Sequence, residues 1–379
     1  MDNKKIKIAI MADAIDRRPE RALFGRRLIE RLLESPELEI HLVHYRSMPD
    51  DPLYHRAHEI ILPRVNFPFG SHFLSFLRFC LTTKERFDIF HWLVGRPYPF
   101  FWLAPAAKII VTAHDAGAVT APGIFTVSKF IFNLVMRYAS RYLDAVIGVS
   151  DFAKEEIIQV FRIPREKVFA IYNGINQELR PVPFSVTQNT FKNKYGVDID
   201  KYFLYLGGLQ THKNVRRLIA AFNLLKSDLP VEEKLIIAGI PSYGKEEVYE
   251  TAKNSPYSQD IIFINYVAVE DLAAFYSGAT ALVYPSLHEG FGLPVVEAMA
   301  CGTPVIATNV TSLPEIAAGA ALLIDPLDPK DIMAAMRRIK TDQSLCRELI
   351  ARGKQRAALF SWDKYASEHV KLYKKTLDR

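Results

Sequence analysis

Short apolar runs alternate with helical stretches along the chain, and this alternation occurs once in each half. The runs Ile109–Val111 and Val146–Ile147 are continuously β-branched, as is typical of strands covered on both faces. Strands joined by helices through short connections form doubly wound parallel sheets. The chain is therefore predicted to be α/β, with strands at 6–11, 40–45, 60–62, 89–94, 108–112 and 145–149, and again at 202–206, 234–238, 261–263, 281–284, 304–307 and 321–324.

A stretch rich in Asn, Pro, Gly and Thr separates the two groups of strands, at residues 173–202. Such a composition without a sustained hydrophobic period is typical of a linker. The chain has 379 residues, which is enough for two hydrophobic cores. We expect an N-terminal domain at 1–182, a second domain at 183–360 and an amphipathic helix at 361–379 that packs back on the first domain.

The composition argues against several classes of protein. The 49% hydrophobic and 24% charged residues are typical of a globular chain, and no run reaches the roughly 18 apolar residues of a membrane-spanning helix. The first apolar run is shorter than that of a signal peptide. The three cysteines, Cys80, Cys301 and Cys346, match no metal or disulfide spacing, which indicates a reducing, cytoplasmic location.

The net charge is +6, and most of the excess lies in residues 1–182, which contain 25 basic and 20 acidic residues. No helix-turn-helix, zinc-finger or aromatic RNA-binding motif accompanies this charge. We therefore expect no nucleic-acid partner. The segment Ser71–Phe87 combines aromatic residues with Arg78, Lys84 and Arg86, which favours either peripheral contact with an anionic membrane or a buried helix with a basic edge.

The most informative segment of the sequence runs from Tyr284 to Pro329. A strand is expected to end at Tyr284, and Pro294 suits the first turn of a helix that ends near Gly302. Between them, Gly290 and Gly292 allow the backbone to approach a ligand closely. The N–H groups at the start of such a helix form an anion site suited to a diphosphate.

Two carboxylates border this expected anion site. Glu289 lies in the loop, and Glu297 lies about one turn into the helix. Fixed carboxylates beside a phosphate site are suited to accept hydrogen bonds from pairs of sugar hydroxyls. The alternative is a surface turn in which Glu297 only favours the helix N-terminus through the dipole.

This segment closely resembles the retaining GT-B glycosyltransferases of the group that includes bacterial mannosyltransferases (family 4, group 1 type). The resemblance rests on two glutamates separated by seven residues, Glu289 and Glu297, with Gly290-Phe291-Gly292 after the first. It implies a GT-B fold, with two Rossmann-like domains facing across a cleft. It also implies that Glu289 contacts the donor sugar, that Glu297 contacts the nucleotide ribose, and that Gly290, Phe291, Gly292 and Leu293 belong to the donor site.

A second element agrees with this resemblance. Glycines and then Lys213-Asn214 follow the expected strand at 202–206, an arrangement suited to phosphate charge. It resembles the Lys-Asn motif of the family, in which the lysine contacts the diphosphate. Many members have an arginine where Gly208 stands, so Lys213 and the helix N-terminus would provide more of the charge stabilisation here. A solvated loop lysine is the alternative.

The first domain resembles the family more loosely. His114, at an expected strand end, resembles the histidine that hydrogen-bonds the donor sugar or the acceptor, and Asp115 would orient its loop. Gly25 lies in a segment that resembles the loop facing the donor phosphates. Ser150 is better suited to cap a helix than to act as a nucleophile.

The resemblance implies transfer of a hexose, with retention of anomeric configuration, from a nucleotide sugar to a glycan or lipid-linked acceptor. GDP-mannose is the first expectation and UDP-sugars the second, with no cofactor and no metal. Asp198 and Asp200 form the Asp-x-Asp pattern of metal-dependent transferases, but their place before a strand favours a turn. A GT-B epimerase, a phosphorylase and a non-catalytic nucleotide-sugar-binding subunit remain alternatives.

Overall fold

The computed structural model describes residues 5–13, 15, 23–63, 65, 71–93, 100–120, 127–241 and 244–379. Two compact units divide the chain. The N-terminal unit comprises Met1–Val119, Phe125–Gly174 and Trp362–Arg379, and the C-terminal unit comprises Thr120–Ile124 and Ile175–Ser361. The division after Gly174 comes somewhat before the expected boundary at 182, and the last helix, α16 (Trp362–Leu377), belongs to the N-terminal unit.

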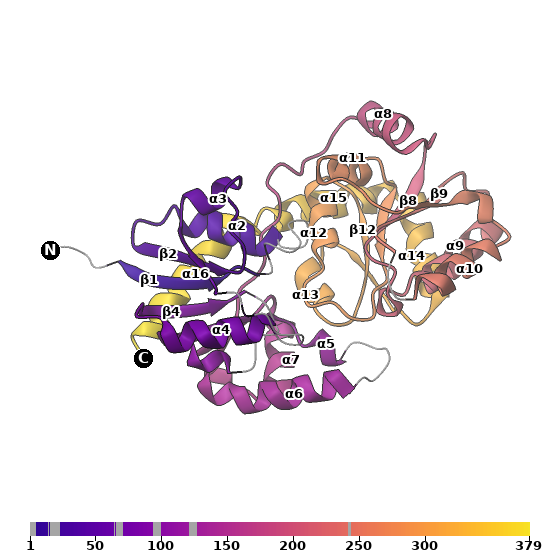
Figure 1. Cartoon of the computed structure of the whole chain (residues 1–379). Coiled ribbons are helices and arrows are strands. Elements are labelled where there is room, and N and C mark those ends of the chain that lie inside the picture. The colour runs from indigo at the N-terminus through magenta and orange to yellow at the C-terminus, as the bar shows by residue number, and fades with distance from the viewer. Residues whose placement is uncertain are drawn as a thin grey trace. The chain divides into compact units, whose positions relative to one another are not determined.

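The N-terminal unit is built on a seven-stranded sheet in the order β3-β2-β1-β4-β5-β6-β7. Its strands β2, β1 and β4 are labelled in Figure 1. Every pair of neighbouring strands is parallel. Strand β7 was not expected from the sequence, because it has only three residues. The strands are β1 (Ile6–Met11), β2 (Leu38–His44), β3 (His58–Ile61), β4 (Phe87–Trp92), β5 (Ala106–His114), β6 (Ala145–Gly148) and β7 (Val168–Ala170).

Both faces of this sheet are buried under helices. Along β1, Ile8 and Ile10 belong to one apolar cluster with α2 and α16, whereas Ala9 and Met11 belong to another with α4, α6 and α7. This alternation follows from the two-residue period of a strand. The helices are α2 (Leu23–Leu32), α3 (Pro52–His55), α4 (Ser71–Thr82), α5 (Gly117–Thr120), α6 (Val127–Ala139) and α7 (Asp151–Phe161).

The C-terminal unit contains a six-stranded parallel sheet in the order β10-β9-β8-β11-β12-β13. Its strands are β8 (Tyr202–Leu206), β9 (Lys234–Ala238), β10 (Ile261–Ile264), β11 (Ala281–Tyr284), β12 (Val305–Thr308) and β13 (Leu322–Ile324). The helices of this unit are α8 (Phe184–Tyr195), α9 (Val215–Asp228), α10 (Lys245–Lys253), α11 (Leu272–Ser277), α12 (Leu293–Ala300), α13 (Leu313–Ala317), α14 (Pro329–Thr341) and α15 (Gln343–Ala357).

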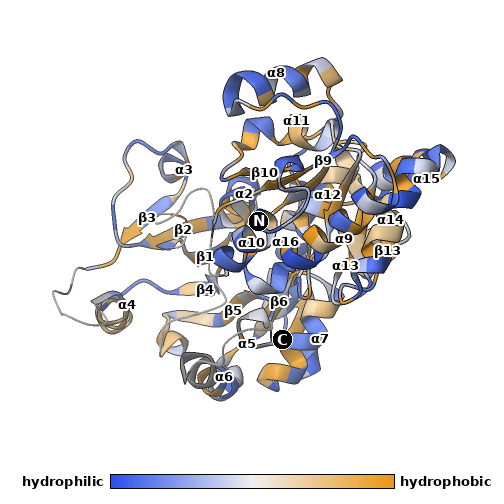
Figure 2. Cartoon of the chain, turned by 90° about the vertical axis from the view of Figure 1, so that its right-hand side faces the viewer, coloured by the Kyte–Doolittle hydropathy of each residue, from blue (hydrophilic) through white to orange (hydrophobic). Residues whose placement is uncertain are grey.

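The helices carry hydrophilic and hydrophobic residues together, as the bands of both colours on α7 show (Figure 2). The side chain of Ser150 caps α7 by accepting a hydrogen bond from Ala153 N at 3.0 Å, which agrees with the capping interpretation. None of the described helices is long and apolar enough to cross a membrane.

One local expectation was wrong. The stretch read as a linker contains α8, which buries only Thr187 and Phe191 and ends at Gly196, so its apolar period is weak. Gly25 lies in the first turn of α2. A Cβ at Gly25 would lie 3.3 Å from Ile15 Cδ1 and from Leu93 Cδ1, so the helix packs closely at this position.

Candidate active site

Two neighbouring strands of the C-terminal sheet, β8 and β11, lead into the segments that carry the predicted donor residues. After β8, the chain passes through Gly207 and Gly208 into a single 3-10 turn at Thr211–Lys213 and then into α9. After β11, it passes through residues 285–292 into α12. Because the strands are parallel, both segments lie at the carboxyl edge of the sheet, where ligands of α/β proteins bind.

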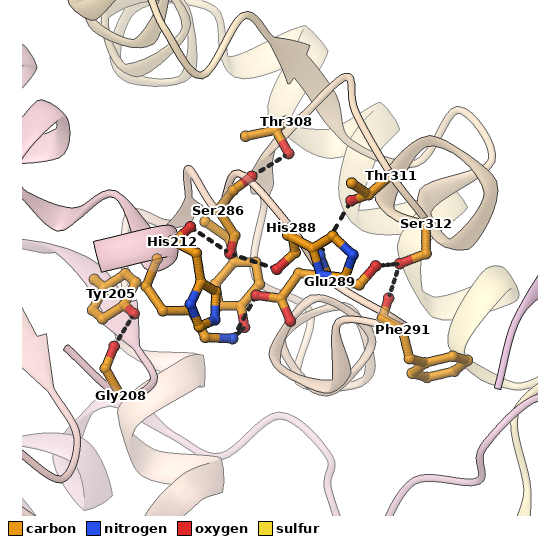
Figure 3. A network of polar contacts seen from close by, with 12 residues as sticks. Tyr205, Gly208, His212, Ser286, His288, Glu289, Phe291, Thr308, Thr311 and Ser312 are labelled. Atoms are coloured by element: carbon orange, nitrogen blue, oxygen red, sulfur yellow. Dashed lines mark hydrogen bonds and ion pairs between the residues drawn. The ribbon is translucent and has the colours of Figure 1, made fainter. Parts of the chain in front are cut away.

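Hydrogen bonds hold these two segments together. Leu287 N donates to His212 O at 2.7 Å, and Ser286 Oγ lies 3.3 Å from His212 O. Thr308 Oγ1, at the end of β12, donates to Ser286 O at 2.9 Å (Figure 3). The 285–292 segment is therefore fixed on both sides by backbone and hydroxyl contacts.

Asn214 fixes the junction between Lys213 and α9. Its backbone is left-handed, with φ of 62°, which asparagine adopts more readily than most residues. Its buried Nδ2 donates to Pro285 O at 2.9 Å and to Pro326 O at 2.7 Å, and Oδ1 accepts from Arg217 Nη1 at 2.8 Å. Asn214 thus has a structural role that accounts for its place beside the lysine.

Lys213 and Glu289 form an ion pair, with Nζ 2.6 Å from Oε1. Their side chains are only 16% and 11% exposed. Lys213 Nζ also donates to Tyr284 OH at 3.2 Å. Burial, with the nearby Glu289 carboxylate, raises the pKa of Tyr284 well above its usual value, so the phenol stays neutral. Two residues predicted independently from separate motifs are therefore in direct contact.

Gly292 and Ser312 fix the loop between Glu289 and α12. Gly292 has φ of 94° and caps α12, and a Cβ there would lie 2.3 Å from Leu313 Cδ2, so both backbone and space require glycine. Ser312 Oγ donates to Glu289 O at 2.9 Å and lies 3.1 Å from Phe291 O (Figure 3). The hydroxyl of Ser312 thereby sets the path of the loop between Glu289 and α12.

Phe291 and Leu293 were both predicted to belong to the donor site. The ring of Phe291 is buried and packs edge-on against Phe360, with centroids 5.5 Å apart. Leu293 is half-buried at the first position of α12, followed by Pro294, as expected for a helix start. The side chain of Phe291 thus anchors the loop in the core and can shape a ligand site only through the backbone.

Glu297 lies in α12, where Tyr276 OH donates to Oε2 at 2.7 Å. Burial raises the pKa of Glu297, while the hydrogen bond from Tyr276 lowers it. The phenol of Tyr276 is itself fully buried in α11. This contact positions one carboxylate oxygen and leaves Oε1 as a further acceptor.

His114 occupies the carboxyl end of β5 in the N-terminal unit, where its φ is 61°. Its Nε2 lies 3.4 Å from Leu93 O, and its ring meets Phe24 edge-on at 5.9 Å between centroids. Burial lowers the pKa of His114 in spite of Asp115, so the imidazole is neutral near pH 7. A neutral ring with one N–H can both donate and accept a hydrogen bond.

Several residues of the site were missed by sequence reasoning. Tyr276, Tyr284, Thr311 and Ser312 contact the predicted residues through single hydroxyl groups. Tyr284 gave a usable signal, because a tyrosine that ends a fully buried strand needs a polar partner. Tyr276 gave none, because it lies in a different helix from Glu297.

Two family descriptions match this chain. Residues 26–179 match Glycosyltransferase Family 4, and residues 187–356 match Glycosyl transferases group 1. The chain belongs to this glycosyltransferase family. The site described above therefore lies in the glycosyltransferase group 1 region, and His114 lies in the family 4 region.

Several similar proteins are named as mannosyltransferases. The O-antigen chain mannosyltransferase B of Escherichia coli is 31% identical over 270 residues, which is 70% of each chain. The serotype-specific mannosyltransferase WbdA of Escherichia coli is 32% identical over 222 residues, 58% of this chain but only 27% of that protein. Among solved structures, HepE of Anabaena in complex with UDP and glucose has a TM-score of 0.77 at 16% identity, covering 98% of this chain and all of that one. The fold is GT-B.

Proposed function

We propose that this glycosyltransferase moves mannose from GDP-mannose to a glycan or lipid-linked acceptor, with retention of the anomeric configuration. The observation that carries the proposal is the Lys213–Glu289 ion pair at the carboxyl edge of the sheet, next to the start of α12. This pair supplies one cation for a diphosphate and one carboxylate for sugar hydroxyls.

The donor diphosphate would compete with Glu289 for Lys213. A phosphate oxygen beside Nζ accepts a charge-assisted hydrogen bond, and N–H groups at the start of α12 add positive potential. Gly292 has no side chain to occupy those N–H groups. Glu289 would then be released to accept hydrogen bonds from the hydroxyls of the sugar.

Glu297 would hold the nucleotide ribose. Its Oε2 is occupied by Tyr276, so Oε1 is the oxygen that the proposal assigns to a ribose hydroxyl. A carboxylate accepts such bonds more strongly than a carboxylic acid. Burial raises the pKa of Glu297, and the hydrogen bond from Tyr276 opposes this rise and so supports the charged form.

Cleavage of the sugar–phosphate bond places negative charge on the leaving diphosphate. Lys213 and the N–H groups of α12 would stabilise this charge, and we therefore propose that transfer needs neither a divalent metal nor a cofactor. The leaving phosphate would take the proton of the attacking acceptor hydroxyl on the same face of the sugar, which gives retention. His114, as a neutral imidazole, would hydrogen-bond the sugar or the acceptor.

Mannose ranks first because the relatives include two proteins named as mannosyltransferases, and GDP-mannose is the donor that the sequence resemblance led us to expect first. UDP-sugars rank second, since HepE was solved with UDP. A thermal-shift panel of GDP- and UDP-sugars tests the donor, since selective binding raises the melting temperature. Sugar transfer from the selected donor then tests the mechanism. NMR of the product tests retention, and the same assay with added chelator tests metal independence. A β-linked product from an α-linked donor rejects retention, and loss of activity with chelator rejects metal independence.

The alternatives give different products. An epimerase would interconvert sugars without an acceptor, a phosphorylase would require inorganic phosphate, and a non-catalytic subunit would bind the donor without turnover. Incubation of the selected donor with and without acceptor separates these outcomes. Transfer that depends on the acceptor supports the proposal.

We further propose cytoplasmic, peripheral contact with an anionic membrane through the N-terminal unit. An aromatic row runs from α4 to the 3-10 turn after α6: Phe73 stacks on Phe100 at 5.8 Å, Phe100 lies 5.3 Å from Trp102, and Trp102 stacks on Tyr142 at 4.9 Å. The Arg141 guanidinium lies 4.0 Å from the ring of Tyr138 beside this row. Phe100, Tyr138 and Tyr142 are exposed, and exposed aromatic rings beside arginine are suited to the lipid interface.

Sedimentation with anionic liposomes tests this contact. Leu134, 59% exposed on α6, and Leu359, 51% exposed in the C-terminal unit, form a matched pair. Leu134→Ser should reduce binding, whereas Leu359→Ser should not. Absence of binding by the wild type at low salt rejects the contact.

A further inference from the structure

Three side chains of metal-binding type, one glutamate and two histidines, meet on one face of the N-terminal sheet, at β2 and β3. Glu39, His41 and His58 each offer a ligand atom, and these atoms all lie within 4.8 Å of one another. We propose that these three residues form a binding site for a transition-metal cation of the zinc type. The proposal is independent of the glycosyl transfer proposed above.

The sheet register brings the three side chains together. His41 of β2 lies directly opposite His58 of β3, and Glu39 lies two residues before His41, so all three project from the same face. The imidazoles of His41 and His58 stack with centroids 4.6 Å apart. Glu39 Oε1 already lies 2.7 Å from His41 Nε2.

The donor set indicates the kind of cation. Two imidazoles and one carboxylate suit Zn²⁺, Co²⁺ or Ni²⁺, whereas Mg²⁺ prefers oxygen ligands. Zinc binds imidazole nitrogen and carboxylate oxygen at about 2.0–2.2 Å in tetrahedral geometry, which places ligand atoms about 3.4 Å apart. The ligand atoms of the cluster all lie within 4.8 Å of one another. Binding would therefore draw the most distant pair together by up to about 1.4 Å and would open the 2.7 Å contact between Glu39 Oε1 and His41 Nε2.

The surroundings limit the flexibility of the cluster. His41 is buried, with 7% of its surface exposed, and its ring packs edge-on against Phe87 of β4 at 5.2 Å. Lys7 of β1 lies opposite Glu39 and is the nearby cation, but its ammonium is paired with Glu85 at 2.5 Å. His58 is exposed and leaves the site open to solvent.

The location separates this site from the proposed chemistry. His58 is the first residue of β3, whereas His114 is the last residue of β5 in the same parallel sheet. The cluster thus lies toward the opposite end of the strands from His114. β3 is a short edge strand that pairs with β2, so a bound ion would cross-link the edge of the sheet.

Tag-free protein, stripped with chelator, is titrated with Zn²⁺ by calorimetry and with Co²⁺ by visible absorption. We expect one equivalent of each to bind, a cobalt spectrum without thiolate charge transfer, and a higher melting temperature with zinc. His58→Ala should weaken zinc binding by about tenfold or more. Mg²⁺ at the same concentration should neither bind nor raise the melting temperature.

His55→Ala is the matched control, because His55 is also exposed and lies three residues before His58 but outside the cluster. It should bind zinc like the wild type. Glu39→Gln provides a second test that leaves both histidines in place, and it should also weaken binding. Absence of zinc binding by the wild type, equal binding by His58→Ala, or a thiolate band in the cobalt spectrum would overturn the proposal.

Discussion

The two parallel sheets differ in what they present at their carboxyl ends. In the C-terminal unit, the strand ends lead to a half-buried ion pair, Lys213–Glu289, and to a loop fixed by Ser312 and Asn214. In the N-terminal unit, β5 ends at a neutral His114 beside Phe24 and the carbonyl of Leu93. Among the residues that the structure describes, the ion pair is suited to bind a charged group, and the neutral imidazole of His114 is suited to contact neutral hydroxyls. In this comparison the fixed ion pair lies in the unit that is proposed to bind the nucleotide.

The largest effect is expected from removing the carboxylate of the ion pair. Glu289→Gln keeps the shape but loses the acceptor proposed for the donor sugar, so kcat should fall on the order of 100-fold. GDP should bind as tightly as before or more tightly, because Lys213 no longer pairs with a carboxylate. Steady-state kinetics and calorimetry with GDP measure the two quantities.

A second buried ion pair provides the control. Lys340 pairs with Glu233, which immediately precedes β9, and so lies at the amino end of that sheet. Glu233→Gln should lower the melting temperature, but kcat per molecule of folded enzyme should stay at the wild-type value. Full turnover in Glu289→Gln would remove this carboxylate from the chemistry.

The neutral histidines of the N-terminal unit should make that unit sensitive to acid. Burial lowers the pKa of His369 in α16 to about 4, and burial also lowers the pKa of His91 and His114. Burial disfavours protonation of these histidines in the folded state but not in the unfolded state. The free energy of unfolding is therefore fully retained above about pH 6.5 and decreases as the pH falls toward 4. For His369 this amounts to about 3 kcal/mol.

Glu297 has the opposite effect on the pH dependence of stability. Its pKa is raised in the folded protein, so its unfavourable contribution to stability disappears on acidification. Hydrogen exchange between pH 7 and 4 should therefore show β4 and α16 losing protection before β8 and β11. His369→Phe should reduce this difference, and the exposed His55→Ala should not. Simultaneous loss of protection in both units would contradict the expected contrast.

The next largest effect is expected on GDP binding, from the loss of Lys213, the cation of the Lys213–Glu289 ion pair. Lys213→Met should weaken GDP binding by about 1.5–3 kcal/mol, the range for a charged hydrogen bond. Guanosine should bind as before, because it has no phosphate to meet Lys213. Calorimetry with both ligands separates this role from general damage, and Lys340→Met is the matched control. Equal losses for GDP and guanosine would show that Lys213 does not contact the diphosphate.

Much of the fold was predictable because parallel strands covered on both faces are continuously apolar. β8, β9 and β11 begin and end at the predicted residues. β7 and α8 were missed for a common reason: a three-residue strand and a helix with two buried residues carry too short an apolar pattern. The close packing of Gly25 against Ile15 and Leu93 also depends on residues outside its own motif.

The site was predictable where one short segment contains its residues, as with Glu289, Gly292 and Glu297. Contact between Lys213 and Glu289 joins residues 76 positions apart and depends on the pairing of β8 with β11. Local sequence carries no information about such a contact. The same holds for Tyr276, whose hydroxyl reaches Glu297 from a neighbouring helix.

The smallest effect is expected from the phenol of Tyr276. Tyr276→Phe removes the hydrogen bond to Glu297 Oε2 and should weaken nucleotide binding by about 1 kcal/mol, roughly fivefold. The same bond lowers the pKa of Glu297, so its loss should raise that pKa further. If ribose binding requires the carboxylate, GDP affinity falls as the pH drops through this pKa, and the fall should begin at a higher pH in the variant.

Calorimetric titration of GDP at several pH values measures both effects. Tyr202→Phe is the matched control, since Tyr202 is another buried phenol that contacts α11 but donates to the backbone carbonyl of Phe275 at 2.8 Å instead of to Glu297. It should lower stability without moving the pH profile. A displaced profile in Tyr276→Phe alone would show that the carboxylate of Glu297 meets the nucleotide in its charged form, whereas identical profiles in both variants would place Tyr276 in the core without a role in binding.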